Sequence, residues 1–392
     1  KVEAFDRAVF KVGGGGTNGP VYALKRPAES FESDQLYIGG AFTNAGGTAV
    51  QNCAMYDGSW HALGDGLNGP VYAIKQYPAA VSPMHFAGDF DSSGTTAVGA
   101  VPGWNYDTES WEPSELTTDG PINALESING NYMVVGGEFE FAGDSGHYYG
   151  VVLYDEQSPL EEALRGLGDG LQRNGTAGAA FDVAADDQGN FYVTGGFTHA
   201  GGKLVNYVAM WDGREWHTLG DGLDSPGEMI AVRGDTVYVI RLFQSLDVNE
   251  VMMWDGVSWS AISPELPHIM VNGFELDTLG HLYLVGRNLD TIGFSGAHGI
   301  IKWNGSQWSE VGGPMTHTTY NPTVNDIYID PLTNDVYVCG IFQTVNGVPA
   351  NNVARWDGNV WHGMGNTVTG EGSPRLIGRA PARPRPPGGS GP

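Results

Sequence analysis

Residues 36–66, LYIGGAFTNAGGTAVQNCAMYDGSWHALGDG, decide the fold because the chain repeats their pattern along its length. A β-rich run ends in two glycines, and a loop of small residues leads to a second run that ends at Tyr56. Asp57 then opens a tight turn, and a short apolar run follows from Trp60. Short β-rich runs bounded by turn residues are typical of a meander of antiparallel strands.

The turn before the tryptophan is the clearest marker of the repeat. Successive markers are separated by 50, 48, 57, 43, 49 and 53 residues, and a tryptophan follows every marker except the third. A period of this size indicates one supersecondary unit that is copied along the chain. The markers are Tyr56-Asp57, Tyr106-Asp107, Tyr154-Asp155, Trp211-Asp212, Trp254-Asp255, Trp303-Asn304 and Trp356-Asp357.

Two further β-rich runs precede each marker, so each copy contains four short strands. Because one four-stranded meander cannot bury both of its faces alone, we expect the copies to pack radially. The prediction is an all-β fold, a seven-bladed β-propeller of four-stranded antiparallel blades within residues 1–370. The predicted blades lie near residues 19–66, 69–117, 120–170, 176–222, 226–264, 268–313 and 323–365.

The two ends of the chain differ from the copies. Residues 1–18 resemble the end of a copy and supply an extra strand or hairpin, which either closes the ring or is the remnant of an eighth blade. Residues 371–392 are rich in Pro, Arg and Gly, and we expect them to form an extended tail.

Charge and cysteine content exclude several classes of partner. The formal net charge of −26, from 45 acidic and 19 basic residues, disfavours binding to nucleic acid or to an anionic membrane. No apolar run is long enough to span a bilayer, so we expect no direct membrane insertion. Cys53 and Cys339 are too few for a disulfide scaffold. A closed ring makes them neighbours that could pair, but two buried free thiols are favoured.

The string GGAFTNAGGTAVQNCAMYDGSWHALGDGLNGPVYAI, which begins at Gly39, resembles a kelch-like repeat. It is similar to the repeats of secreted bacterial β-propellers and of fungal cortical polarity-marker ectodomains. The resemblance covers most of residues 19–365. It implies a propeller that is secreted or displayed on the extracellular cell surface, and it implies no catalytic residues.

The string LGDGL, which links one copy to the next, is the candidate metal site. It occurs three times, centred on Asp65, Asp169 and Asp221. Several aspartates at the mouth of a channel could bind Ca²⁺, which takes multiple oxygen ligands. The favoured alternative is that Asp between two glycines is good turn chemistry, because no EF-hand spacing accompanies the string. We expect no other cofactor.

Motifs for catalysis are missing from the sequence. We find no nucleophile elbow and no zinc-binding histidine motif, although the many acids leave a carboxylate pair for sugar hydrolysis open. His61, His217 and His362 share one repeat position directly after the tryptophan, and we expect them to face solvent. The chain is therefore predicted not to be an enzyme.

The loops between second and third strands vary most between copies and carry aromatic residues. Such loops on one face of a propeller are typical binding sites, although the rings could equally pack their own loops. We predict a non-catalytic binding or assembly module for a protein partner; the alternative is a carbohydrate-binding or carbohydrate-active propeller that uses copies three and six. The candidates are Trp104, Phe141, His147, Tyr148, Tyr149, Phe294 and His298 in the loops, and Arg375, Arg379, Arg383 and Arg385 in the tail.

Overall fold

The computed structural model confirms an all-β chain, in which strands make up nearly all of the regular structure. None of the described residues belongs to a helix that is long and apolar enough to cross a membrane. The structure describes residues 17–19, 21–27, 35–57, 59–77, 83–128, 132–142, 146–155, 158, 163–243, 248–263, 266–267, 270–287, 289, 299–318, 321–350 and 353–363. The predicted N-terminal strand or hairpin and the C-terminal tail lie outside these residues, apart from positions 17 and 18.

Seven antiparallel sheets in the described residues share one plan, in which four strands pair with their neighbours in chain order. We number these sheets as blades 1 to 7. Blade 1 contains β1 (Val21–Lys25), β2 (Leu36–Gly40), β5 (Cys53–Tyr56) and β6 (Trp60–Ala62). Blade 2 contains β7 (Val71–Gln76), β8 (Met84–Gly88), β11 (Gly103–Asn105) and β12 (Ser110–Glu112). Blade 3 contains β13 (Ile122–Ile128), β14 (Tyr132–Gly137), β17 (Val151–Tyr154) and β18 (Leu164–Arg165). Blade 4 contains β21 (Ala179–Ala185), β22 (Phe191–Gly196), β25 (Val208–Trp211) and β26 (Trp216–His217).

The remaining three blades follow the same order. Blade 5 contains β27 (Gly227–Arg233), β28 (Thr236–Phe243), β29 (Val248–Trp254) and β30 (Trp259–Ala261), and β31 (Leu266–Pro267) also pairs with β29. Blade 6 contains β32 (Met270–Leu276), β33 (Leu282–Arg287), β34 (Ile300–Trp303) and β35 (Trp308–Glu310). Blade 7 contains β37 (Thr323–Ile329), β38 (Val336–Ile341), β41 (Val353–Trp356) and β42 (Trp361–Gly363).

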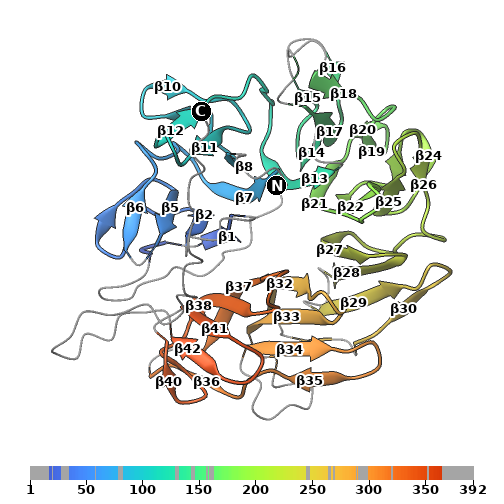
Figure 1. The fold of residues 1–392 in the computed structure, drawn as a ribbon. Helices are drawn as coiled ribbons and strands as arrows, with labels where there is room; N and C mark the ends of the chain where they lie inside the picture. Colours follow the sequence, from blue (N-terminus) through green and yellow to red (C-terminus); the bar gives the residue numbers. More distant parts are fainter. Residues whose placement is uncertain are drawn as a thin grey trace, which may run out of the picture.

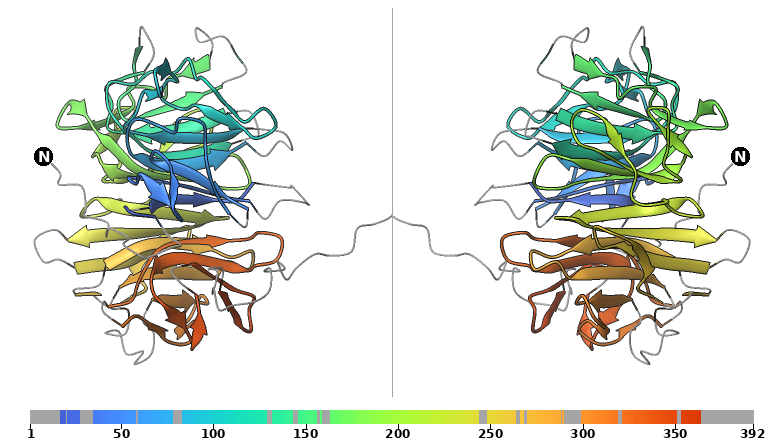
Figure 2. Two further views of the ribbon diagram at one scale, coloured as in Figure 1. Left: turned by 90° about the vertical axis from the view of Figure 1, so that its left-hand side faces the viewer. Right: turned by 90° about the vertical axis from the view of Figure 1, so that its right-hand side faces the viewer.

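The blades surround a common axis, and the first strand of each blade lies beside the first strands of its two neighbours (Figure 1). Strand β1 lies beside β37, so the ring closes between the first and last blades. Figure 2 shows the same ring from its two sides. Every first strand also carries a register shift at the same repeat position, as between Val21 and Ala23 or between Ala180 and Asp182. Such bulges bend a strand and re-aim its side chains, here at the axis.

The glycines at the end of the second strand allow neighbouring blades to approach each other. A Cβ atom on Gly39 would lie 2.4 Å from the Val71 side chain of blade 2. A Cβ on Gly136 would likewise lie 3.1 Å from Ala180 of blade 4. The repeated glycines are therefore explained by contact between blades as well as by turns.

In five blades the repeated tryptophan of the fourth strand links its blade to the blade before it. Its indole N–H donates a hydrogen bond to a backbone carbonyl near the end of the previous fourth strand. The five bonds join Trp111 to Leu63 (3.0 Å), Trp216 to Leu167 (2.8 Å), Trp259 to Leu219 (2.7 Å), Trp308 to Ile262 (2.9 Å) and Trp361 to Gly312 (3.0 Å). Blade 3 lacks this tryptophan, and its Arg165 guanidinium instead lies 4.6 Å from the centre of the Tyr132 ring.

Small hairpins between second and third strands fold back over the outer edge of their blades. The Thr48 hydroxyl donates to the Trp60 carbonyl at 3.3 Å, and Lys203 Nζ donates to the Trp216 carbonyl at 2.7 Å. The hairpins are β3 (Asn44–Ala45) with β4 (Thr48–Ala49), β9 (Ser92–Ser93) with β10 (Thr96–Ala97), β15 (Phe141–Ala142) with β16 (Gly146–His147), β23 (His199–Ala200) with β24 (Lys203–Leu204), and β39 (Thr344–Val345) with β40 (Val348–Pro349). Two links between blades add strands that we did not predict: β19 (Leu171–Arg173) with β20 (Thr176–Ala177), and β36 (Met315–Thr316).

Both cysteines are free and buried, as the sequence favours. Cys53 is fully buried and Cys339 is 7% exposed. Burial raises the pKa of both thiols, which keeps them protonated and unreactive at neutral pH.

Arg26 joins the first blade to the last and gives a direct test of ring closure. Its Nη1 donates to the Tyr337 hydroxyl at 2.8 Å and lies 3.3 Å from Asp330 Oδ2. We expect Arg26→Met to lower the free energy of unfolding by about 1–3 kcal/mol, because these charged hydrogen bonds are mostly shielded from water. Hydrogen exchange should accelerate in β1 and β37. Arg214→Met, which changes an exposed arginine, is the matched control. Equal hydrogen-exchange rates in the Arg26→Met and Arg214→Met variants would contradict this role for Arg26.

Candidate axial binding site

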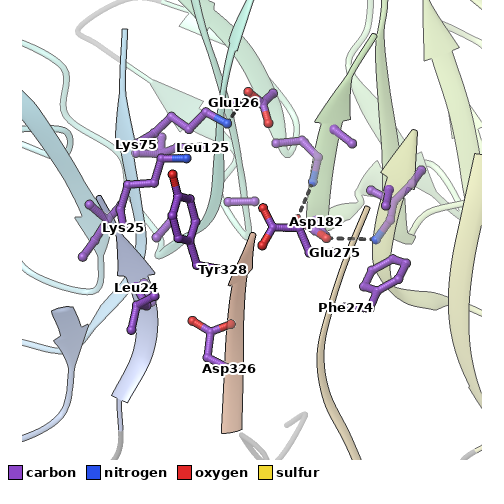
Figure 3. A pocket seen from close by; sticks show the side chains of 18 of the residues that line it. Leu24, Lys25, Lys75, Leu125, Glu126, Asp182, Phe274, Glu275, Asp326 and Tyr328 are labelled. Carbon is purple, nitrogen blue, oxygen red and sulfur yellow. Dashed lines mark hydrogen bonds and ion pairs between the residues drawn. The ribbon is translucent and has the colours of Figure 1, made fainter. Parts of the chain in front are cut away.

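A cavity of about 390 Å³ lies at the axis and is lined by the first strands of all seven blades. We call this cavity the axial channel. Charged side chains from different blades point into it (Figure 3). This gathering of charge is unusual for the centre of a fold, because burial penalises ionised groups unless they are paired. The charged residues of the lining are Lys25, Lys75, Glu126, Asp182, Glu275 and Asp326.

The strand register sorts these residues into two layers along the axis. The first layer holds the residues two positions after the register shift of each first strand, as Lys25 follows the shift between Val21 and Ala23. The second layer lies two residues earlier in the strand, where Asp182 faces Thr194 and Asp326 faces Cys339. The first layer comprises Lys25, Lys75, Glu126, Glu275 and Tyr328, with alanines in blades 4 and 5. Ala23, Ala73 and Ala124 occupy the second layer in the first three blades.

The two lysines of the first layer have different surroundings. Lys75 Nζ lies 2.5 Å from Glu126 Oε1 and forms an ion pair. Within the described residues, Lys25 Nζ has no hydrogen bond or ion pair, and it lies 5.3 Å from the centre of the Tyr328 ring. Burial lowers the pKa of the Lys25 ammonium and the nearby Lys75 lowers it further, against the opposing effect of two carboxylates. Lys25 is therefore a cation that the surrounding protein only partly compensates.

Backbone N–H groups hold the carboxylates of the channel in place. Asp182 Oδ2 accepts from the Ile230 N–H of blade 5 at 2.9 Å, and its Oδ1 accepts from the Val183 N–H at 2.9 Å. Burial raises the pKa of Asp182 from 3.8 to about 7, although these two hydrogen bonds favour the ionised form. A carboxylate with this pKa changes its charge near neutrality.

Glu275, two blades further round the ring, is held in a similar way. Its Oε2 accepts from the Ile329 N–H of blade 7 at 2.8 Å. Burial raises the pKa of Glu275, and the positive charge of Lys25 opposes this shift. Asp326 Oδ1 accepts from the Ile327 N–H at 2.9 Å. The carboxylates therefore keep fixed positions, which is a property of binding sites rather than of mobile surface charges.

A second cavity of about 330 Å³ adjoins the channel and shares Lys25, Glu275 and Tyr328 with it. Arg26 and Arg233 line this second cavity. Arg233 donates to the backbone carbonyls of Asp277, at 2.8 Å, and of Thr278. Four cations, Lys25, Lys75, Arg26 and Arg233, therefore lie at this end of the axis together with the carboxylates of Glu126 and Glu275.

The structure corrects our interpretation of Trp104. It lies in β11, is only 5% exposed and packs edge-on against Trp111 with ring centres 5.1 Å apart. It also pairs with Trp111 in the register that Trp211 and Trp216 show in blade 4. Trp104-Asn105 is therefore the true marker of blade 2, in place of the predicted Tyr106-Asp107, and its ring belongs to the core rather than to an exposed loop.

The other loop and tail candidates are placed only in part. Tyr148 and Tyr149 are half-buried, and Tyr148 packs against the core between blades 2 and 3. Phe141 lies in β15 and His147 in β16, but the description does not extend to their side chains. The candidates outside the described residues are Phe294, His298, Arg375, Arg379, Arg383 and Arg385.

The aspartates of the LGDGL strings do not converge. Asp65, Asp169 and Asp221 are each exposed in a separate link between blades. In the part of the chain that the structure describes, no three His, Cys, Asp or Glu side chains are grouped to hold a metal ion. The Ca²⁺ site stays a prediction, with the turn role as its alternative.

The histidines that follow the tryptophan are half-exposed, as predicted, and each binds the aspartate of its own marker turn. The Nε2-to-carboxylate distances are 2.9 Å for His61 with Asp57, 2.8 Å for His217 with Asp212 and 2.7 Å for His362 with Asp357. This pairing explains why the two residue types recur together.

The charged channel is the part of the site that sequence reasoning missed. A signal was present, because the first strands VYALK, VYAIK and INALE align Lys25, Lys75 and Glu126 at one repeat position. Charged residues at a repeated strand position that should be buried are the pattern to look for. Asp182 and Asp326 share a different repeat position, which only the strand register reveals.

The ring of meanders defines this chain as a β-propeller. A family model described as the Rax2 C-terminal beta propeller domain matches residues 61–237, which is less than half of the chain. This match supports the resemblance to fungal cortical polarity markers, while the resemblance to bacterial secreted propellers stays a prediction. No curated protein matches the chain.

Two solved structures of the extracellular domain of the BT4673 system from B. thetaiotaomicron are similar to it in fold. They have TM-scores of 0.54 and 0.53 at 12% and 11% identity, and they cover 88% and 87% of this chain. The chain spans 39% of the length of each of these structures. The WD40 β-propeller domain of Doa1 matches with a TM-score of 0.48 at 10% identity over 87% of this chain and 93% of that one. At these identities the likeness concerns the fold alone.

Proposed function

We propose that the chain is a non-catalytic binding module that works outside the cell and binds its ligand in the axial channel. The observation that carries the proposal is the set of charged side chains that the fold places around a cavity. Apolar residues of similar size would fill this space at a lower cost in stability. Fixed charges that lower stability and line a cavity are characteristic of functional sites.

The chemistry of the channel supports binding rather than catalysis. Its lining contains acids, lysines, an asparagine, tyrosines and apolar residues, and the described lining includes no Ser, Thr, Cys or His. His is the commonest general acid or base and Ser, Thr and Cys are frequent nucleophiles, so only the carboxylates, lysines and tyrosines of the described lining could do such work. The extracellular setting is supported by the resemblance to secreted propellers and by the BT4673 domains, which are extracellular in their own protein.

Native mass spectrometry tests this function directly. The purified full chain is incubated with a defined mixture of amino acids, organic acids, amines and monosaccharides, and unbound molecules are then removed. We expect one class of molecule to remain bound and to be released unchanged, and we expect Lys25→Met to reduce the bound fraction at least tenfold. Lys302→Met is the matched control, because Lys302 also lies over a tyrosine ring but outside the channel. Absence of any adduct, or release of an altered product, would sink the proposal.

The protein partner and the glycan ligand that the sequence suggests remain proposals for the outer surface. A partner that contacts the tail should co-purify less well after deletion of residues 373–392. Of the aromatic loop candidates, Tyr148 and Tyr149 are the two whose side chains are described and half-exposed. A glycan array on Tyr148→Ala and Tyr149→Ala variants would separate sugar binding there from packing of the loop.

A further inference from the structure

We infer that the axial channel binds a small zwitterion, a molecule that carries a carboxylate and an ammonium group a few ångströms apart. This inference rests on the proposed binding function and specifies the class of its ligand. It follows from two features of the lining: Lys25 of the first layer has no hydrogen-bonded partner among the described residues, and the second layer holds the acids Asp182 and Asp326 but no base.

Lys25 is the anchor for the ligand carboxylate. Its ammonium carries three N–H donors, and no partner accepts from them within the part of the chain that the structure describes. Lys75 lies in the same layer but is already paired with Glu126. Arg26 and Arg233 line the adjoining cavity and add positive potential at this end. A ligand carboxylate beside Lys25 would accept hydrogen bonds from its ammonium and add to the partial charge compensation from Glu275 and Glu126.

Asp182 and Asp326 are the anchors for the ligand ammonium. They lie two residues earlier in their strands than the Lys25 layer, which corresponds to about 6–7 Å along the axis. The two backbone hydrogen bonds to Asp182 occupy only part of its acceptor capacity, because a carboxylate offers about four lone pairs. Alanines in the same layer of blades 1 to 3 leave room beside them.

A ligand with only one charge would fit this lining less well. An anion would compensate Lys25 but would approach three carboxylates, Asp182, Glu275 and Asp326, and a cation would approach Lys25. In a cavity lined by protein from all seven blades, both repulsions are stronger than they are in bulk water. A zwitterion compensates the charge of Lys25 with its carboxylate and the charge of the acidic layer with its ammonium. The ligand should be small, because a cavity of about 390 Å³ is at the small end of the range for ligand sites.

Three probes with the same three-carbon chain test the inference on the full-length protein at neutral pH. They are 4-aminobutanoate, which carries both charges, butanoate, which carries only the carboxylate, and propylammonium, which carries only the ammonium. Binding is measured by isothermal calorimetry and by the shift in Tm. We expect 4-aminobutanoate to bind at least tenfold more tightly than either of the other two. Lys25→Met and Asp182→Asn should each weaken it at least tenfold, while Lys302→Met should leave it unchanged.

Other results overturn the inference in distinguishable ways. Equal affinity for butanoate would make the channel an anion site, and equal affinity for propylammonium would make it a cation site. In both cases the proposed binding function would stand. Retention of a sugar or a neutral molecule from the defined mixture would likewise refute the zwitterion alone. If no probe and no molecule from the mixture binds, the binding function falls as well. Circular dichroism confirms folding, and Asp326→Asn replaces Asp182→Asn if the latter fails to fold.

Discussion

Replacement of Trp216 by alanine is expected to lower the free energy of unfolding by about 3–5 kcal/mol, the range for a buried tryptophan. Its side chain is 2% exposed and its indole N–H donates to the Leu167 carbonyl of blade 3 at 2.8 Å. The ring also packs edge-on against Phe191 with centres 5.6 Å apart. The change therefore opens a cavity and leaves a carbonyl without its donor at the same contact between blades. Urea unfolding followed by circular dichroism measures the loss.

Two further variants help to separate the contributions of side-chain volume and of the hydrogen bond to stability. Trp216→Phe keeps an aromatic ring but removes the donor to Leu167, and we expect it to cost about 1–3 kcal/mol. Val257→Ala, which removes an 81% exposed apolar side chain, should change stability by less than about 0.5 kcal/mol. If Trp216→Ala is no more harmful than Val257→Ala, the tryptophan does not hold the blades together.

The scaffold could be predicted from the sequence because its residues recur. Each copy must make the same turn, the same close approach and the same contact with the previous blade, so residues such as Gly39 and Trp216 reappear at a regular spacing. The physical role of the tryptophan was not predictable in the same way. Its hydrogen-bond acceptor lies 49 residues away, and only ring geometry brings the two together.

The error in blade 2 has a local cause. Tyr106-Asp107 and Trp104-Asn105 are both aromatic-turn pairs, and the spacing does not distinguish them. The structure selects Trp104 because Asn105 Oδ1 accepts from the Asp107 and Thr108 N–H groups, at 3.0 and 3.2 Å, and so forms the turn. Trp104 then faces Trp111 across the hairpin. A competing turn signal two residues away moved the prediction by two positions and placed a core residue on the surface.

The candidate site was harder to predict because its residues differ from one repeat to the next. Its six charged residues come one each from blades 1, 2, 3, 4, 6 and 7. They meet only when the ring closes. One repeat position holds Lys25, Lys75 and Glu126, while Ala184 and Ala231 hold it in blades 4 and 5. Differences between the repeats at a position that faces the axis are therefore informative about function. The residues that recur in the repeats specify the fold.

Asp182→Asn is expected to become more stable relative to the native protein as the pH rises from 5 to 8, by about 2–3 kcal/mol. The pKa of Asp182 is raised from 3.8 to about 7 in the folded state, so between these values the folded chain holds a proton that the unfolded chain has lost. The native protein therefore loses stability as pH rises through this window, and the loss is complete above pH 7. Asparagine carries no charge, so the Asp182→Asn variant does not lose this stability as the pH rises. Urea unfolding at pH 5 and pH 8 measures the change.

Asp255→Asn is the matched control for this pH effect. Asp255 also accepts two backbone N–H bonds, from Val257 at 2.9 Å and Ser258 at 2.8 Å, but it is exposed and these bonds lower its pKa. It is ionised in both states at pH 5 and at pH 8, so the stability difference between Asp255→Asn and the native protein should not depend on pH. A pH-independent difference for Asp182→Asn as well would show that Asp182 is ionised throughout. Because an ammonium group beside Asp182 favours the carboxylate, saturating 4-aminobutanoate should also reduce the pH dependence of the native protein.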